Sequence, residues 1–525
     1  MELILIMIMF GSVFITSEHF INIENDAKAY FIGIALIILL LTCSITRNGL
    51  GKLKDSLRAS NLSTGITVIC LILSVYGLLQ FWSFIPSRHY AFRITGTYEN
   101  PAGFAAVQAS LFPFSLILCF RKEKHHLIQL FAVLTTIACA STIILSGSRS
   151  GLLAIFASSI IVFAFKTNAY QLLKTHKYLW IFLIIISIIF FFLLFHIKQD
   201  SSKGRLFIWS ICWDMIKERP LLGYGVGGIE KYYMDAQATY FSKNPNSPFV
   251  MLADNVIHPF NEYIKLTVNY GLLGLIFALC LLYLTIKRLL KSNNDVKIIG
   301  LAITTSVFVL CQFSYPFHYA AVWLITAIAI IPAFLNENEM RWTTPIYLRI
   351  LLPTIFSLLL VTLLQMIYLD LKWAEVSKRS LAGHTERMLP YYEKMKPLMQ
   401  HNPLFLYNYA AELNYIGKYD KSLTITKECQ NGWNDYDVQI LLADNFENTG
   451  QIDLAINTYQ HALDMIPSRF EPLNSMMNIY LNNRDTLNAI AVANRISNKP
   501  VKIKSMRVEQ IKSEALKILQ MNEGQ

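Results

Sequence analysis

The stretch IIGLAITTSVFVLCQFSYPFHYAAVWLITAIAIIPAFL, residues 298–335, contains no Asp, Glu, Lys or Arg. It divides into two apolar blocks, and a helix needs about 20 apolar residues to cross roughly 30 Å of hydrocarbon. Similar blocks recur along the chain, and the full set of predicted spans is 2–16, 29–45, 63–82, 101–120, 127–145, 150–165, 178–197, 262–286, 298–316, 319–335 and 347–370. The sequence therefore predicts an all-α fold, a polytopic membrane helix bundle of about 11 spans.

Composition agrees with a membrane protein that carries a polar tail. Of the 525 residues, 54% are apolar and 15% are charged, whereas a soluble domain has about 25% charged residues. Many of the Lys and Arg residues behind the net charge of +11 lie in short loops, where they control topology, so we expect no nucleic-acid partner. The eight cysteines are scattered singly without metal-site spacing, and only a Cys212–Cys429 disulfide stays open.

Basic residues predict the orientation of the spans, because Lys and Arg mark cytoplasmic loops. One set of loops holds Arg47, Lys52, Lys54, Arg58, Arg121, Lys122, Lys124, Lys166, Lys174, Lys177, Lys287, Arg288, Lys291, Lys297 and Arg341, and the opposite short loops hold Lys28, Arg88, Arg93 and Arg149. We predict a bacterial inner-membrane protein with its N-terminus inside. Segment 198–261 and the C-terminal tail then lie in the periplasm.

The long segment 198–261 is where we expect function, since long ordered loops are usually functional. Its stretch RLFIWSICWDMIKERP, residues 205–220, has apolar residues at helical spacing and predicts a helix across the bundle mouth. The following GYGVGG, residues 223–228, satisfies G-x-G-x-x-G but lacks the preceding strand of a nucleotide site. A turn that ends the helix and a close backbone approach to glycan or phosphate both stay open.

The tail repeats with a period of 33 to 34 residues, seen in GKYDKSL from 417, GQIDLAI from 450 and NRDTLNAI ending at 490. This period resembles tetratricopeptide repeats, helix pairs stacked into a soluble α-solenoid. We predict a membrane domain over 1–370, a helical connector over 371–401 and a repeat domain over 402–525. Because such solenoids bind peptides, a protein partner is expected at the repeats.

Four arginines at the predicted periplasmic face are candidate ligands for a lipid-linked diphosphate: Arg93, Arg149, Arg205 and Arg219. Arg holds such anions with a planar fork of donors that stays charged. Snorkelling of each side chain to the membrane interface is the alternative. Arg149, inside the tight SGSRSG turn at 146–151, would be costly to bury without a partner such as phosphate.

His258 precedes the span at 262–286 and is a candidate general base, with Glu262 as the second candidate. A hydrogen-bonded structural histidine and a carboxylate in the first helical turn are the alternative readings. The acidic residues of the periplasmic segment are isolated, so neither a metal nor another cofactor is expected.

Four motifs in order, GTYENPAGFA, SGSRSGLLA, GRLFIWSICWDMIKERPLLGYGVGG and HPFNEYIKLTVNYGLLG, resemble the O-antigen ligase and polymerase superfamily over roughly residues 90–290. The resemblance implies a metal-independent, inverting transferase that moves glycan from undecaprenyl diphosphate to an acceptor hydroxyl. It implies that Arg205 and Arg149 hold the diphosphate and that His258 is the base. This chain departs from the family pattern at Pro259 and Phe260, which separate His258 from Asn261 and Glu262.

Three acceptors fit this family: a glycolipid for a ligase, a second glycan for a polymerase, and protein Ser or Thr for an O-oligosaccharyltransferase. Two other classes were weighed. A transporter of lipid-linked glycan predicts charges deep inside the spans, and blocks 127–145 and 298–316 contain none. A non-catalytic scaffold does not require so many spans or a long ordered loop.

Overall fold

The computed structural model describes residues 1–46, 49–58, 60–121, 126–167, 178, 199–335 and 346–523. The predicted span 178–197, apart from Tyr178, lies outside these residues, as do the loop residues Arg47, Lys122, Lys124, Lys174, Lys177 and Arg341. The described part of the chain is helical and contains no strand, which confirms the predicted all-α class.

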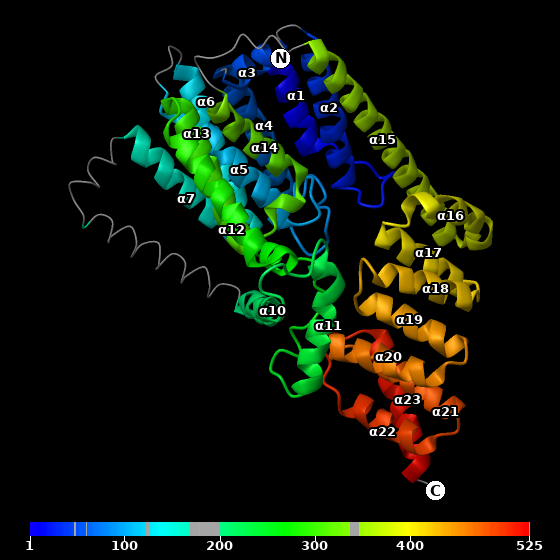
Figure 1. Ribbon diagram of the computed structural model, residues 1–525. Helices are drawn as coiled ribbons and strands as arrows, with labels where there is room; N and C mark the ends of the chain where they lie inside the picture. The colour runs from blue at the N-terminus through cyan, green and yellow to red at the C-terminus, as the bar shows by residue number, and fades with distance from the viewer. Residues whose placement is uncertain are drawn as a thin grey trace. The chain divides into compact units, whose positions relative to one another are not determined.

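The membrane helices follow the predicted blocks closely (Figure 1). They are α1 (Glu2–Phe14), α2 (Asp26–Ile45), α4 (Ser60–Phe81), α5 (Pro101–Cys119), α6 (His126–Ser146), α7 (Arg149–Lys166), α12 (Glu262–Leu290), α13 (Asn294–Phe313), α14 (Ala320–Phe334) and α15 (Ile346–Arg379), with a 3₁₀ turn at Pro316–His318. The short basic helix α3 (Gly49–Arg58) lies in a segment that was predicted to be a loop. Among the described helices, eight are long and apolar enough to span a membrane. The apolar helices α1 and α14, with 13 and 15 residues, are shorter than the blocks that predicted them.

Two compact units make up the chain. The membrane unit comprises the described residues of 1–197, 260–263 and 276–374, and the loop–repeat unit comprises those of 198–259, 264–275 and 375–525. The loop–repeat unit contains α10 (Gln199–Glu218), α11 (Gly228–Lys243), a π turn (Ser380–His384), α16 (Thr385–Met399), α17 (Pro403–Tyr415), α18 (Tyr419–Gln430), α19 (Tyr436–Asn448), α20 (Ile452–Met465), α21 (Glu471–Asn482), α22 (Thr486–Asn498) and α23 (Met506–Glu523).

Helix α5 is the centre of the membrane unit, where it packs against α4, α6, α7, α13 and α14. Every residue from Gly103 to Leu118 is buried. Small residues allow this close approach, as in other membrane bundles. Ser306 of α13, for example, donates to the carbonyl of Ala109 at 2.8 Å.

Sequence signals at helix starts explain why α5 and α7 begin where they do. Asn100 accepts hydrogen bonds from the backbone N–H groups of Ala102 and Gly103, and Pro101 occupies the first turn. Gly147 adopts φ +69° after α6, and Ser148 then caps α7 by accepting from Gly151 N. Arg149 is thereby placed in the first turn of α7.

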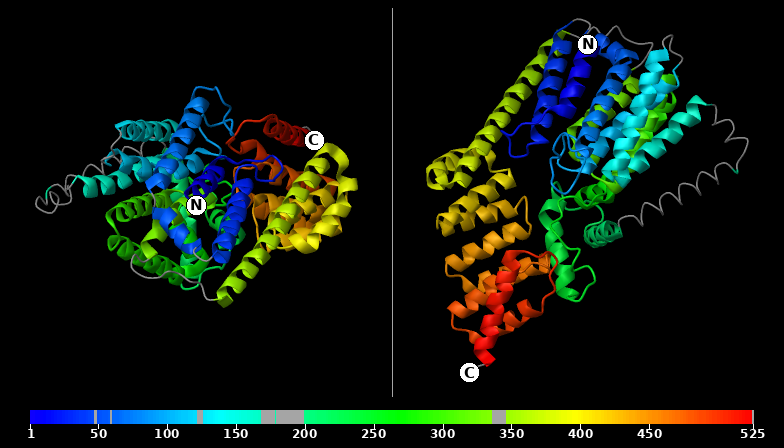
Figure 2. Two further views of the ribbon diagram at one scale, coloured as in Figure 1. Left: turned by 90° about the horizontal axis from the view of Figure 1, so that it is seen from above. Right: turned by 180° about the vertical axis from the view of Figure 1, so that it is seen from behind.

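The tail forms three helix pairs, α17–α18, α19–α20 and α21–α22, in which each helix packs on the next (Figure 2). The turn inside each pair contains one residue with positive φ: Gly417 at +78°, Gly450 at +76° and Arg484 at +60°. These positions are 33 and 34 residues apart, which matches the period of the sequence. The tetratricopeptide assignment itself stays a prediction. The Cys212–Cys429 disulfide is wrong, since both thiols are free and buried.

Candidate active site

Helix α10 carries Arg205 and ends just before Arg219, and it forms where the sequence predicted a helix. Its buried face consists of Phe207, Ile208, Ile211, Cys212, Met215 and Ile216, at the spacing of three and four residues that one helical face requires. Phe207 packs among the rings of Tyr240, Phe241 and Phe249. The partly exposed Arg205 lies near the start of this helix, and the exposed Arg219 directly follows its end.

Arg219 contacts an aromatic ring in its own unit. Its guanidinium lies 4.7 Å from the ring centre of Tyr224, and the Tyr224 hydroxyl donates to Glu218 at 2.9 Å. Burial and this hydrogen bond raise the pKa of Tyr224 to about 12, so the phenol stays protonated at neutral pH. The Arg219 guanidinium therefore lies over the Tyr224 ring, just after the end of α10.

The glycine-rich turn docks on a break in helix α12. Gly271 has φ +65° and ψ −169° inside the helix, and backbone hydrogen bonds join the two segments there. Tyr224 N donates to Val268 O at 2.9 Å, Gly225 N to Asn269 O at 2.7 Å, and Leu272 N to Pro220 O at 2.8 Å. A Cβ on Gly223 would collide with the Val268 carbonyl, and one on Gly271 with the Leu221 carbonyl.

This docking settles why the chain needs glycine at two positions. At Gly223 the close approach is to the backbone of α12. An approach of this turn to glycan or phosphate stays a prediction. Gly225 and Gly227 also have positive φ, but a Cβ at either would meet open space. Their requirement for glycine is therefore conformational.

The segment carrying His258 is tied to α10. Trp209 of α10 donates its indole N–H to the carbonyl of Pro259 at 2.8 Å. The His258 ring is partly exposed and its Nδ1 is buried. Arg205 and Trp209 are four residues apart on α10, so their side chains share one face of the helix. The structure thus brings the Arg205 side of α10 and the His258 segment together within the loop–repeat unit.

The other predicted residues belong to the membrane unit. Arg149 is partly exposed in the first turn of α7, and the exposed Arg93 lies over the ring of Phe81 at 5.8 Å. Glu262 is the first residue of α12, where Asn261 accepts a hydrogen bond from Tyr263 N and donates to the carbonyl of Gln312 at 3.1 Å.

Sequence reasoning missed a polar cluster at the start of α5. Glu99 lies 3.8 Å from His318, and Asn100 donates to the Tyr315 hydroxyl at 3.0 Å. Burial raises the pKa of the Glu99 carboxyl, and the nearby Glu24 raises it further. The available signals were the Glu-Asn pair inside GTYENPAGFA and His318, a titratable residue inside an otherwise apolar stretch.

Two more contacts of the membrane unit lie beside this cluster. The ring of Tyr315 lies 5.6 Å from Phe260, the second residue after His258, and Phe260 itself has φ +55°. Lys28, which we counted with the outer loops, is buried in the first turn of α2 and donates to the carbonyls of Glu24 and Thr97.

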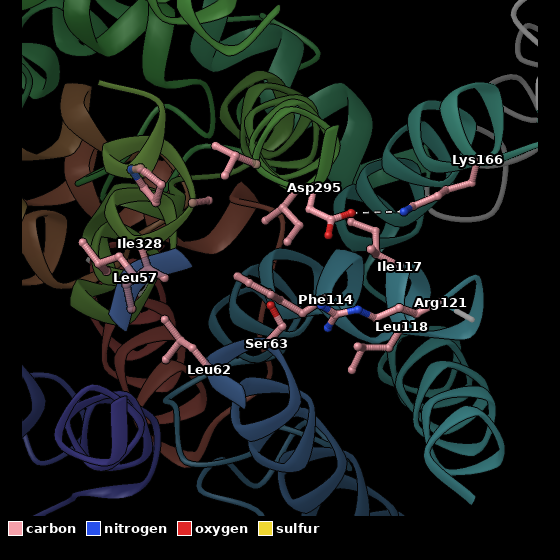
Figure 3. Close-up of a pocket in the computed structure, with 14 residues that line it drawn as sticks. Leu57, Leu62, Ser63, Phe114, Ile117, Leu118, Arg121, Lys166, Asp295 and Ile328 are labelled. Atoms are coloured by element: carbon pink, nitrogen blue, oxygen red, sulfur yellow. Dashed lines mark hydrogen bonds and ion pairs between the residues drawn. The ribbon is translucent and has the colours of Figure 1, made fainter. Parts of the chain in front are cut away.

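A pocket lies at the other end of α5 (Figure 3). Its charged members are Arg121, Lys166 and Asp295, and Lys166 and Asp295 form an ion pair of 3.3 Å. The remaining lining is mostly apolar and includes Phe114, Ile117 and Leu118. In the predicted topology this end faces the cytoplasm, so it is not where we expect periplasmic transfer. Across the described residues, no group of three or more His, Cys, Asp or Glu is arranged to hold a metal ion.

Comparison with known proteins points to one family. Residues 131–279 match the family model described as O-antigen ligase. This region includes Arg149, Arg205, Arg219, His258 and Glu262, and Arg93 lies outside it.

Curated relatives include a Rickettsia conorii protein with the name "Putative polysaccharide ligase", 29% identical over 130 residues, which are 25% of this chain and 30% of the relative. A Rickettsia felis protein of the same name is 33% identical over 98 residues, 18% of this chain and 23% of the relative. The chain thus spans less than a third of the length of these relatives.

Proposed function

Since residues 131–279 place this chain in the O-antigen ligase superfamily, we propose that it is a glycosyltransferase. It moves a glycan from undecaprenyl diphosphate to an acceptor hydroxyl at the periplasmic face of a bacterial inner membrane. The family match supports ligase-like glycan transfer. The donor, the acceptor and the membrane face extend the proposal beyond that match.

One contact carries the proposal most directly, the hydrogen bond from Trp209 to the carbonyl of Pro259. It joins the helix face that bears Arg205 to the residue next to His258. A cation for a leaving group and a base for an acceptor are the two groups that such a transfer needs. Both lie in a part of the chain covered by the family match.

The reaction follows from these two groups. Arg205 binds the diphosphate and stabilises the charge that develops as the bond from the anomeric carbon to the diphosphate oxygen breaks. His258 takes the proton of the acceptor hydroxyl, whose oxygen forms the new bond from the opposite face of the sugar. Transfer in this single displacement inverts the anomeric centre and releases undecaprenyl diphosphate.

The remaining candidates have supporting roles in the proposal. Arg149, Arg93 and Arg219 are further candidate ligands of the diphosphate. Glu262 is the base if His258 does not reach the acceptor. No step uses a metal ion, because the arginines neutralise the leaving group.

Three acceptor classes remain within this proposal: a glycolipid, a second carrier-linked glycan and a protein hydroxyl. A ligase, a polymerase and a protein O-oligosaccharyltransferase differ in the acceptor and share the chemistry above. The missing product in a deletion strain identifies which acceptor is used.

The test is complementation of a gene deletion in the host with the native, Arg205→Ala, His258→Ala and Lys217→Ala forms. Lys217 is a matched control, since it is an exposed cation of the same helix that pairs with Asp214 and lies over the ring of Trp213. We expect native protein and the control to restore the glycolipid ladder or the glycoprotein bands, and the two site variants to lose about 100-fold or more of the product. Full complementation by both site variants, at normal membrane levels, would overturn the assignment.

A further inference from the structure

Helix α11 and the segment that follows it pack against the C-terminal repeats, within the loop–repeat unit. We propose that the repeats are an internal scaffold that positions the loop bearing Arg205 and His258. The repeat surface that faces α11 is therefore occupied by this chain's own loop. The scaffold is independent of the transfer chemistry, and only its effect on catalysis rests on the proposed function.

Asp235 of α11 is the first anchor. Its carboxylate accepts from His461 Nε2 at 2.8 Å and from the side-chain amide of Asn434 at 3.0 Å to each oxygen. Gln439 donates to the Asn434 carbonyl oxygen at 2.7 Å and fixes the orientation of that amide. Asp235 thus receives hydrogen bonds from α20 and from the turn before α19.

Buried polar contacts on α11 strengthen this anchor. Gln237 is fully buried and donates to the carbonyl of Met465, the last residue of α20, at 2.7 Å. Asn434 N donates to the carbonyl of Glu230 at 3.1 Å. A buried polar group that loses its hydrogen-bond partner destabilises the folded protein. These contacts therefore favour one arrangement of α11 on the repeats.

A second anchor lies just before His258. Asp254 contacts Arg469 at 3.2 Å and Lys502 at 3.5 Å, and Lys502 also donates to the carbonyl of Ala253 at 3.0 Å. Asn255 donates to Asp437 at 3.1 Å and accepts from Tyr436 N at 3.3 Å. Three consecutive residues, 253–255, are therefore held by the tail three positions before His258.

These anchors connect to the candidate catalytic groups through packed elements. Helix α11 packs against α10 as well as α20, and its buried face includes Ile229, Tyr233, Met234, Ala238 and Phe241. A displacement of α11 from α20 would move α10, which carries Arg205. It would also release the 253–258 segment. Asp235, His461 and Asn434 are positioning residues in this scheme.

Hydrogen–deuterium exchange of the full-length protein in detergent tests the scaffold. The variants are Asp235→Ala, His461→Ala, the double variant and His461→Gln, with Asp214→Ala as the control. Asp214 is an exposed carboxylate of the same loop that pairs with Lys217. His461→Gln keeps a side-chain N–H that can donate to Asp235.

We expect amide exchange in 228–243 and 253–258 to rise about tenfold in His461→Ala, as for the loss of one charge-assisted hydrogen bond. Asp235→Ala should raise it further, because it also removes the hydrogen bonds from Asn434. The double variant should exchange about like Asp235→Ala, because that variant has already lost the His461 bond. His461→Gln and Asp214→Ala should exchange like the native protein. Unchanged exchange in the alanine variants, or a double variant equal to the product of the singles, would overturn the proposal.

Transfer activity gives a second readout. We expect the turnover rate to fall in the alanine variants and to recover in His461→Gln, which a purely structural loss of the tail would not do. If an anchor variant fails to insert into the membrane, Arg469→Ala replaces it as the test variant, because Arg469 is a half-exposed surface residue. If exchange rises without a fall in transfer, the repeats do hold the loop, but their proposed effect on catalysis is wrong. If even the native protein shows no transfer, the proposed function fails. The exchange result then still tests the scaffold by itself.

Discussion

Burial raises the pKa of several carboxyl groups outside the membrane spans, and Asp435 is the clearest case. Desolvation raises its pKa from 3.8 to about 6, even though the carboxylate accepts from Asp437 N and Val438 N at the start of α19. The folded protein then binds more protons than the unfolded chain between about pH 4 and pH 6. Stability contributed by Asp435 therefore falls as pH rises through this window.

Asp435→Asn should remove that pH dependence. Asparagine caps a helix about as well as aspartate and carries no charge to bury. We expect α19 to be better protected in the variant than in the native protein at pH 7, with the difference shrinking as pH falls through this window and vanishing below about pH 4. The measurement is amide exchange of 436–448 corrected for intrinsic rates. Weaker protection of the variant at pH 7 would show that the charged form stabilises the cap.

The aromatic contact between Tyr315 and Phe260 gives a residue-level test of the missed cluster. Tyr315→Ala removes the ring beside Phe260, whereas Tyr315→Phe removes only the hydroxyl that accepts from Asn100. We expect Tyr315→Ala to lower the transfer rate about tenfold, the effect of about 1.4 kcal/mol on the barrier, and Tyr315→Phe to retain most of it. Equal activity of both variants with the native protein would exclude this contact from positioning the His258 segment.

At the scale of elements, the break in α12 has a direct stability test. Gly271 occupies a conformation that is essentially restricted to glycine, which costs other residues about 1–3 kcal/mol, and its Cβ position is filled by the Leu221 carbonyl. Gly271→Ala should lower the melting temperature by several degrees. Gly204→Ala is the control, because Gly204 lies within α10 and has open space at its Cβ position; it should be neutral or stabilising. A Gly271→Ala protein as stable as the native one would contradict the observed docking.

The turns inside the helix pairs allow a glycine to be added at one position with positive φ and removed at another. Arg484 is exposed and holds φ +60° where the two preceding repeats have Gly417 and Gly450. Arg484→Gly should stabilise the third helix pair by up to about 1 kcal/mol, and Gly450→Ala should destabilise the second pair by a similar amount. Amide exchange of α21–α22 and α19–α20 measures the two effects. Slower exchange after Gly450→Ala would be inconsistent with the left-handed turn.

Most helices were predictable because one property, apolarity over a sufficient length, decides them. The amphipathic α10 and the 33 to 34 residue period were also predictable from spacing. The break at Gly271 was not, since the apolar block 262–286 continues through it and its cause is the distant turn 220–225. Helix α11 was missed because its buried face depends on packing against α10 and α20, which the local sequence does not record.

The candidate site was predictable only in part, for the same reason. Arg205 and His258 came from motifs, but the Trp209 bond that joins their segments links residues 50 positions apart. Glu99 and His318 are separated by more than 200 positions and meet only in the folded bundle. Sequence spacing identifies chemistry-bearing residues one by one, whereas long-range packing decides which of them come together.

At the scale of the whole molecule, the chain combines a membrane unit with a loop–repeat unit in which α11 packs against α20 of the repeats. Arg149, Arg93 and Glu262 belong to the first unit, and Arg205, Arg219 and His258 belong to the second. The proposed leaving-group cation and base, Arg205 and His258, thus belong to one unit.

The most direct test is glycan transfer by purified protein in lipid vesicles supplied with an undecaprenyl-diphosphate-linked glycan and extract from the deletion host as the acceptor source. We predict release of undecaprenyl diphosphate with one new inverted glycosidic bond, undiminished by a metal chelator and abolished in Arg205→Ala and His258→Ala but retained in Lys217→Ala. Transfer that requires a divalent metal, or that survives both site variants, would contradict the account.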